Sequence, residues 1–368
     1  MVNKKLKVGI IGCGDIANYK HMPALKELSD LCEMTSFCDI RINRAVKAAE
    51  EFGIKDSKVY EDYKELLEDD DLDVIHVLTP NDSHSPITVA ALDAGKHVMC
   101  EKPMAHNKKS AEKMMEAWRN SNKKFTIGYQ NRFREDVQQL KTDCQNDKIG
   151  EIYFAKAHAL RRKAVPSWGV FLDKSKQGGG PLIDIGTHAL DLTLWIMDNY
   201  EPVTVSGSVF NKMSDQTKGN LFGPWNPNKY GVEDSAFGFI KMKNGAAVFL
   251  ESAWILNTRD PKEASATFYG TKRGAELRWN LSDDKNELIY NMIEEGQYKE
   301  IKESSIKKMG PAASEKVSLG YLEAASWINA IIRDKSPLVK PEEAYMVTKI
   351  LDAVYESERK GREIKFDN

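Results

Sequence analysis

The spacing of apolar residues changes about one third of the way along the chain. Up to about residue 128, short apolar runs such as residues 6–11 and 72–79 alternate with amphipathic segments such as residues 41–52 and 85–95. In these segments apolar residues recur at helical spacing. Strands that alternate with helices are typical of right-handed βαβ units around a parallel sheet. We therefore predict an α/β domain over residues 1–128.

Later in the chain the apolar residues alternate with a period of two, as in residues 151–160 and 246–256. The pair Asn244-Gly245 stands between two such runs, where it favours a two-residue hairpin turn. The predicted helices of this part are Leu182–Met197, Leu319–Arg333 and Pro341–Arg359. We predict a second, α+β domain over residues 129–368 with a large, open and mostly antiparallel sheet. Packing of the last helix, residues 341–360, back on the first domain is left open.

Composition narrows the possible partners and surroundings of the chain. Its 368 residues include 53 Lys and Arg and 55 Asp and Glu, so it has no excess of positive charge to hold nucleic acid. The five cysteines form no CxxC pair, and a disulfide framework or zinc site is not expected. No apolar run approaches the ~20 residues that cross a bilayer. We expect a cytoplasmic protein without a membrane partner.

A glycine motif follows the first predicted strand. Gly12, Gly14 and Ala17 form G-x-G-x-x-A directly before a predicted helix. The first glycine permits a tight turn, the second lets a pyrophosphate approach the backbone, and the helix N-terminus then faces the anion. We predict a dinucleotide site here, to which Asp15 and Ile16 at the start of the helix also contribute. The strand before the motif and the helix after it make this prediction specific.

The second strand ends at Asp39, where a carboxylate can accept hydrogen bonds from a ribose 2′-hydroxyl and repel a 2′-phosphate. This favours NAD over NADP. Arg41 and Arg44 follow closely, and either can turn toward a phosphate, so NADP stays an alternative and Arg44 is included in the cofactor site. A helix N-cap role for Asp39 is a second interpretation of the same residue, compatible with the first.

Three further segments carry a family resemblance: residues 78–105 (with Glu-Lys-Pro), 127–133 and 178–192. Together with the glycine motif, in this order and spacing, they make the chain resemble the glucose–fructose oxidoreductase, inositol dehydrogenase and rhizopine catabolism (Gfo/Idh/MocA) family of nicotinamide-dependent sugar dehydrogenases. The resemblance implies a Rossmann domain followed by an open sheet that also serves as an oligomer interface. Relatives are commonly dimers or tetramers.

The resemblance also assigns roles to individual residues. It implies that Lys102, Asp184 and His188 form the catalytic group. It further implies that the cofactor is lined by Thr79, Pro80, Asn81, His84, Glu101 and Lys102, and that the peptide bond before Pro103 is cis. On the substrate side we expect Tyr129, Arg162, Trp168, Asp184 and His188. An aromatic face and guanidinium donors suit a polyhydroxylated ring.

Asp184, His188 and Asp191 have a physical argument of their own. Asp184 and His188 are four residues apart, so on a helix they share one face with Asp191, and the rest of the helix is apolar. Polar groups in such a helix need partners. The alternatives are a satisfied core histidine with capping carboxylates, or a metal site, which we do not expect because no second ligand cluster completes it. The run Gly178–Gly180 before the helix is expected to give a flexible approach.

We therefore expect an NAD(P)-dependent oxidoreductase that transfers hydride from a secondary hydroxyl of a sugar, inositol or glycoside to nicotinamide. On resemblance we favour the third ring carbon of a glucose-type ring. Two other functions stay open: NAD-assisted glycoside cleavage, and a non-enzymatic sugar or dinucleotide sensor. Small-molecule substrates and formation of a homo-oligomer complete the prediction.

Overall fold

The computed structural model describes residues 4–280, 285–303 and 318–366. The chain forms two compact units, and each is treated by itself below. Unit 1 comprises Met1–Gln130 and Ala312–Tyr345, and unit 2 comprises Asn131–Pro311 and Met346–Asn368. Residues 312–345 thus fall with the first part of the chain, whereas the sequence pattern places everything after residue 128 in one second domain.

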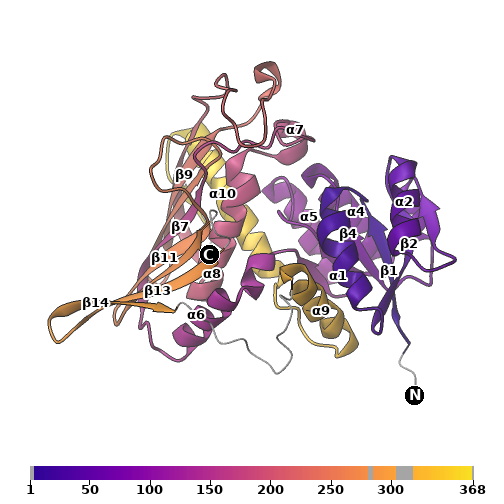
Figure 1. The fold of residues 1–368 in the computed structure, drawn as a ribbon, viewed down its shortest axis with the longest axis horizontal. Coiled ribbons are helices and arrows are strands. Elements are labelled where there is room, and N and C mark those ends of the chain that lie inside the picture. The colour runs from indigo at the N-terminus through magenta and orange to yellow at the C-terminus, as the bar shows by residue number, and fades with distance from the viewer. Residues whose placement is uncertain (1–3, 281–284, 304–317, 367–368) are drawn as a thin grey trace. The chain divides into compact units, whose positions relative to one another are not determined.

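Unit 1 contains a six-stranded parallel sheet in the order β3-β2-β1-β4-β5-β6 (Figure 1). The central strands are apolar and buried on both faces, as a sheet covered by helices on each side requires. The order reverses between β1 and β4, which is where such sheets bind ligands. The strands are β1 (Leu6–Ile11), β2 (Cys32–Cys38), β3 (Lys58–Tyr60), β4 (Val74–Val77), β5 (His97–Cys100) and β6 (Phe125–Ile127).

The helices of unit 1 connect these strands, and a late helix joins them. A π-helical turn, η1 (Ala17–His21), precedes α1 (Met22–Glu27). The others are α2 (Ile42–Phe52), α3 (Tyr63–Leu67), α4 (Asn81–Asp93), α5 (Lys108–Asn120) and α9 (Leu319–Ile332). α9 packs on α1, and its Trp327 and Ile328 are buried in the same apolar core as Met22 and Leu25. This packing explains why residues 312–345 belong to unit 1.

Unit 2 contains a nine-stranded sheet in the order β14-β13-β12-β11-β7-β10-β9-β8-β15. Every neighbouring pair is antiparallel except β7 and β10. The predicted hairpin joins β9 to β10, with Gly245 at a φ of +90°. The strands are β7 (Ile152–Leu160), β8 (Pro202–Phe210), β9 (Ser235–Met242), β10 (Ala247–Ala253), β11 (Lys262–Gly270), β12 (Gly274–Asn280), β13 (Lys285–Glu294), β14 (Gln297–Glu303) and β15 (Ile364–Lys365). The predicted fold class of both domains is confirmed.

The helices of unit 2 cover one face of this sheet. α8 packs on β7 and β11, and α6 packs on β12 and β13. Gly207 and Gly238 leave room for Val354 of α10, because a Cβ at either position would lie 2.6 or 3.0 Å from that side chain. The helical segments are η2 (Gln130–Phe133, beginning at the unit boundary), α6 (Glu135–Gln145), α7 (Lys174–Gln177), η3 (Leu182–Gly186), α8 (Thr187–Met197), η4 (Pro227–Lys229) and α10 (Pro341–Lys360, whose first residues belong to unit 1).

The opposite face of the sheet carries large side chains, and we call it the open face. It is defined by cross-strand neighbours on β7, β9, β10 and β11, namely Phe154, Lys156, Phe239, Phe249, Thr267 and Tyr269. Phe239 is 40% exposed. The rings of Phe154 and Tyr269 lie 5.4 Å apart, and Lys156 lies over the Tyr269 ring. Cross-strand pairs of this kind stabilise a sheet, and Phe239 keeps part of this face exposed.

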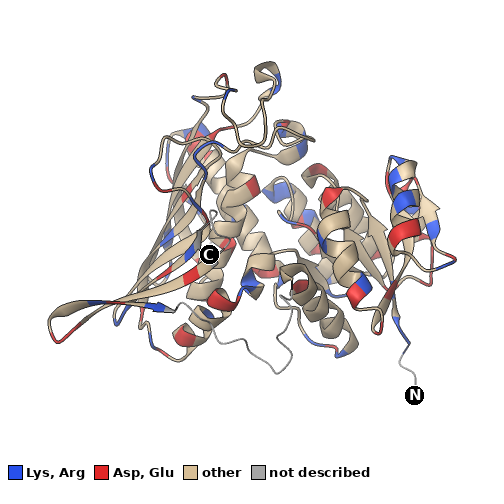
Figure 2. Cartoon of the chain, viewed as in Figure 1, with Lys and Arg blue, Asp and Glu red and all other residues tan. Residues whose placement is uncertain are grey.

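Charged residues of both signs are interspersed over each unit in the view of Figure 2, in keeping with a net charge of −2. Within the described residues, no helix combines the length and the apolar character that a membrane crossing needs.

Candidate active site

The glycine motif forms the turn between β1 and the first helical residues of unit 1. Gly12 has a φ of +95°, and a Cβ there would lie 2.5 Å from the carbonyl oxygen of Leu78. Only glycine fits this position. At Gly14 the nearest heavy atom to a Cβ would be Nη1 of Arg44, 3.9 Å away, so the backbone there is open to approach. The amide of Asn18 donates to the carbonyls of Cys13 and Gly14 and holds the turn from within.

Asp39, at the end of β2, fastens the glycine turn to its neighbouring strand. Its Oδ2 accepts the backbone N–H of Cys13 at 2.9 Å, and its Oδ1 accepts that of Arg41 at 2.8 Å. The N-cap of α2 is Arg41, with no side-chain cap bond, so Asp39 does not cap the helix as the second interpretation held. Burial, together with the charge of Asp39, raises the pKa of the Cys13 thiol to about 12. Cys13 is therefore neutral at physiological pH.

The loop after β4 lies against the glycine turn. The methyl group of Thr79 would be 3.0 Å from a Cβ at Gly12. The Thr79 hydroxyl is buried and has no hydrogen-bond partner among the residues that the structure describes. Pro80 is the N-cap residue of α4, and Asn81, largely buried, begins that helix. A hydroxyl without a protein partner at this depth is a place where a ligand atom satisfies the protein.

His84 and Glu101 were predicted to line the cofactor, and both are engaged with the protein. His84 is buried, with Nδ1 2.8 Å from the carbonyl oxygen of Pro103 and Nε2 2.8 Å from that of Thr79. It thereby ties the loop after β4 to the turn after β5. Burial lowers the pKa of His84. The peptide bond between Lys102 and Pro103 is cis, as the resemblance implied.

The carboxylate of Glu101 is the centre of a buried cluster. Its Oε1 lies 2.6 Å from the ammonium of Lys20 and 2.7 Å from Nε2 of His21, and its Oε2 accepts the backbone N–H of Lys102 at 3.0 Å. Lys20 also lies 2.8 Å from a carboxylate oxygen of Glu323. The ammonium thus bridges two buried carboxylates and holds the turn that carries Lys102.

The charges of this cluster follow from burial and proximity. Burial alone would raise the pKa of Glu101, but the ammonium of Lys20 and the contact with His21 hold it well below its usual range. Burial raises the pKa of Glu323, which Lys20 offsets only in part. His21, Glu101 and Glu323 lie close enough together to hold a metal ion. However, Lys20 already supplies a cation between the two carboxylates, so we assign the cluster to charge balance.

These observations fit a dinucleotide. The turn is open at Gly14, helix N–H groups follow it, and the hydroxyl of Thr79 needs a partner. Three of these residues follow the carboxyl ends of neighbouring strands: Asp39 follows β2, Thr79 follows β4 and Glu101 follows β5. This is the edge at which parallel sheets bind ligands. The exposed Asp15 and half-buried Ile16 begin the helix beside this turn.

In unit 2, Asp184 lies in the π-helical turn η3 and His188 in the first turn of α8. The predicted single helix is thus a continuous helical segment with a widened first turn, a feature frequent at functional sites. Oδ2 of Asp184 accepts the indole N–H of Trp254 at 3.0 Å. Nη1 of Arg161 lies 4.0 Å from the same oxygen.

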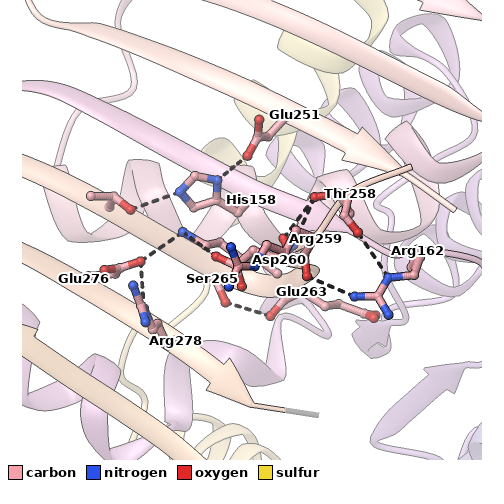
Figure 3. Close-up of polar contacts among 12 residues, drawn as sticks. His158, Arg162, Glu251, Thr258, Arg259, Asp260, Glu263, Ser265, Glu276 and Arg278 are labelled. Carbon is pink, nitrogen blue, oxygen red and sulfur yellow. Dashed lines mark hydrogen bonds and ion pairs between the residues drawn. The ribbon is translucent and has the colours of Figure 1, made fainter. Parts of the chain in front are cut away.

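Arg161 is itself held in place. It pairs with both carboxylate oxygens of Glu263, and its Nε lies 2.7 Å from one of them. Its neighbour Arg162 points elsewhere, because successive residues of an extended chain face opposite sides. Arg162 donates to the backbone carbonyls of Thr258 and Arg259 (Figure 3). The sequence pattern favoured Arg162, but the arginine beside Asp184 is Arg161, and a substrate contact for Arg162 stays a prediction.

Asp191 is engaged in a buried ion pair. Nη2 of Arg132 lies 2.6 Å from its Oδ1, Nε also contacts the carboxylate, and Arg132 is fully buried. Arg132 further donates to the hydroxyl of Tyr200. The carboxylate of Asp191 therefore balances a buried guanidinium. This removes Asp191 as a ligand from the alternative metal site of Asp184, His188 and Asp191.

The glycine run before η3 serves packing and gives no flexible approach, contrary to expectation. A Cβ at Gly179 would lie 1.9 Å from the hydroxyl oxygen of Tyr355, and one at Gly180 would lie 2.4 Å from the carbonyl oxygen of Glu233. The carboxylate of Glu233 accepts from the Tyr355 hydroxyl at 2.7 Å and from the N–H of Leu182 at 3.2 Å. Burial raises the pKa of Glu233. This close packing fixes the start of the helix that carries Asp184.

Tyr129 and Trp168 differ in their surroundings. Tyr129, in unit 1, is fully buried, whereas Trp168, in unit 2, is 47% exposed. Their predicted contacts with substrate stay predictions.

Family models identify both parts of the chain. Residues 6–129 match the oxidoreductase family with an NAD-binding Rossmann fold (GFO_IDH_MocA), and residues 141–366 match the C-terminal alpha/beta domain of the same family. The chain belongs to the Gfo/Idh/MocA oxidoreductase family.

Similar proteins agree with the assignment. The Gfo/Idh/MocA chain is 35% identical to the D-glucoside 3-dehydrogenase of Escherichia coli (strain K12), over 99% of each chain. It is 29% identical to the myo-inositol 2-dehydrogenase of Thermotoga maritima, over 67% of this chain and 68% of the relative. The aldose-aldose oxidoreductase from Caulobacter crescentus shares the fold with a TM-score of 0.79 at 23% identity, over 99% and 100% of the two chains.

The two glycines of the motif predict different effects when replaced. Gly12→Ala should destabilise the ligand-free protein, by about 1–2 kcal/mol for the left-handed backbone alone, with a further cost from the contact with Leu78. Gly14→Ala should leave the thermal midpoint unchanged but weaken NAD binding about tenfold, equivalent to about 1.4 kcal/mol. Calorimetry measures both quantities. Unimpaired NAD binding by Gly14→Ala would contradict the proposed pyrophosphate approach.

Replacement of Lys20 in the buried cluster should strongly lower the stability of the protein. Lys20→Met leaves two buried carboxylates without their ammonium and should lower the free energy of unfolding by about 3–5 kcal/mol near neutral pH. Because the folded-state pKa of Glu101 is depressed, its stabilisation is present above the unfolded-state pKa and is lost as the pH falls. The deficit of the variant should therefore shrink in acid. Urea unfolding across pH checks this.

The matched control is Lys243→Met, which breaks a pair of similar length, 2.9 Å to Glu201, in which the lysine and glutamate side chains are 57% and 69% exposed. It should change stability little, since surface pairs contribute little. Equal losses for the two variants would show that burial of the Lys20 pair is not decisive.

Proposed function

We propose that the chain is an NAD-dependent dehydrogenase that oxidises the C3 hydroxyl of a glucoside. The observation that carries the proposal is Asp184, fixed by Trp254 and faced by Arg161, one helical turn from His188. The near full-length relative named D-glucoside 3-dehydrogenase supports the glucoside and the third carbon. A relative named glucose-6-phosphate 3-dehydrogenase, 32% identical over 58% of this chain, supports the same carbon.

The roles of the residues follow from their chemistry. His188 takes the proton of the substrate hydroxyl, because an imidazole is a base near neutral pH. Asp184 holds the neighbouring hydroxyl or orients His188, and its own position is set by the indole N–H of Trp254. The ammonium of Lys102 stabilises the negative charge that develops on the oxygen. The glycine turn and the loop after β4 would hold NAD, whose nicotinamide would supply the hydride acceptor that turns the secondary hydroxyl into a ketone.

NAD is proposed over NADP because of Asp39. Each of its carboxylate oxygens accepts one backbone N–H and keeps further lone pairs for a ribose hydroxyl. A 2′-phosphate next to the same carboxylate would be repelled. Arg44, close to Gly14, is the residue that opposes this preference.

We also propose that the open face of unit 2 joins copies of the chain. A sheet face with partly exposed Phe239 and the Phe154–Tyr269 pair is an apolar surface of the kind that oligomers bury.

The activity is tested with purified protein, NAD or NADP, and methyl glucoside. We expect absorbance of reduced cofactor with NAD and little with NADP, and a 3-keto product by NMR. His188→Ala and Lys102→Ala should each lower turnover by about 10²–10⁴-fold, the range of general acid–base catalysis. NAD binding should stay nearly intact in both variants.

Normal turnover in both variants would refute the assigned roles. Cleavage of the glycoside with a retained cofactor and no net NADH would instead identify NAD-assisted cleavage. Faster reduction of NADP than of NAD would reverse the interpretation of Asp39.

The oligomer is tested by sedimentation of Phe239→Asp, which places a charge on the open face and should shift the protein toward smaller species. Ile332→Asp, on α9 of unit 1 and 42% exposed, is the control and should sediment like the wild type. Unchanged sedimentation of Phe239→Asp would place the contact elsewhere.

A further inference from the structure

Two loops of unit 2 are fastened to each other through their polar groups. The side chain of Asn220 accepts the backbone N–H of Val165 at 2.8 Å and donates to its carbonyl at 2.9 Å. The backbone N–H of Leu221 donates to the carbonyl of Lys163. The hydroxyl of Ser167 donates to the backbone carbonyl of Phe222. The loops lie together beside α7 in Figure 1. The polar side chains of Asn220 and Ser167 are thus occupied within the protein.

Three apolar side chains of the same loops are exposed. Leu221 is 75% exposed, Trp168 47% and Phe222 38%. The rings of Trp168 and Phe222 meet edge to face with centroids 5.1 Å apart, and Phe171 lies 5.7 Å from Trp168. We call Trp168, Phe171, Leu221 and Phe222 the aromatic ledge. Large apolar side chains that gather at the surface in this way mark binding surfaces.

The ledge begins next to the proposed reaction centre. The guanidinium of Arg161 lies 5.8 Å from the ring centroid of Phe222, and its Nη1 lies 4.0 Å from Oδ2 of Asp184. One side chain therefore separates the ledge from the carboxylate that we assign to the reacting sugar. A group attached to that sugar reaches the ledge, whereas a free monosaccharide has no such group.

We propose that the aromatic ledge is the subsite for the aglycone of the glucoside, and that this aglycone is aromatic or otherwise apolar. The inference rests on the proposed function and names its substrate class. An aromatic ring gains area burial and favourable edge-to-face contacts on Trp168 and Phe222. A second sugar is less suited to the ledge, because its four side chains are aromatic or aliphatic and the polar side chains of Asn220 and Ser167 beside it bond to backbone groups.

The test compares phenyl and methyl glucosides of the same anomeric configuration by kcat/KM. Wild type should prefer the phenyl glucoside. Trp168→Ala should lower kcat/KM for the phenyl glucoside about tenfold, the effect of one lost apolar contact. Leu221→Ser should also lower kcat/KM for the phenyl glucoside, whereas its effect on the methyl glucoside, which does not reach the ledge, should be small. Tyr153→Ala, on β7 and 54% exposed, is the control and should change neither value.

Several results would overturn the inference while leaving the proposed function intact. They are an equal loss on both substrates in Leu221→Ser, no preference of the wild type for phenyl over methyl, or a loss on cellobiose as large as that on the phenyl glucoside. If no glucoside is oxidised, the proposed function fails. The ledge is then judged by equilibrium binding of phenyl glucoside, which Trp168→Ala should weaken about tenfold. Equal binding would reject it.

Discussion

The buried carboxylate of Glu101 is the group on which the site in unit 1 depends. It stays ionised in the interior because Lys20 and His21 lie within 2.7 Å of one of its oxygens, and its other oxygen accepts the N–H of Lys102. A neutral carboxylic acid would make weaker hydrogen bonds to these donors. One charge balance therefore positions the backbone of the proposed catalytic lysine and joins η1, the end of β5 and α9 in a single cluster.

Unit 2 uses the same means to fix Asp184. The carboxylate is oriented by the indole N–H of Trp254 on one side and faces Arg161, whose charge is balanced by Glu263. Glu233 fixes the start of the same helical segment through Leu182. In both units the proposed functional group lies near a π-helical turn, η1 or η3. A widened turn shifts side chains out of the regular helical register, and the surrounding buried charges hold them there.

The parts of this architecture that depend on local pattern were predictable from the sequence. The parallel sheet, the glycine turn, the β9–β10 hairpin and the helical placement of Asp184 and His188 all follow from residues close together in the chain. The parts that depend on distant residues were not. The partner of Lys20 on α9 is about 300 positions away. Residue types also could not show that Gly179 and Gly180 pack against Tyr355 and Glu233.

Arg161 and Arg162 show most clearly what residue type and position in the sequence cannot decide. Both have the same charge and adjacent positions, but Arg161 pairs with Glu263 and faces Asp184, whereas Arg162 donates to the backbone carbonyls of a loop. Deciding between them requires knowing where the strand ends and which face the helices cover. The missed signal was the alternation along residues 151–160, which, extended by one residue past β7, separates the two arginines.

Asp39 links cofactor choice to the geometry of the glycine turn. Its carboxylate accepts the N–H of Cys13 within the turn, and that of Arg41 before α2, so the group that we propose selects against a 2′-phosphate also shapes the glycine turn. Removing the whole side chain would leave the N–H of Cys13, which is buried, without its acceptor. A change of preference toward NADP therefore needs a replacement that still accepts this hydrogen bond, such as Asn or Ser. Arg44, already beside Gly14, then supplies the positive charge for the added phosphate.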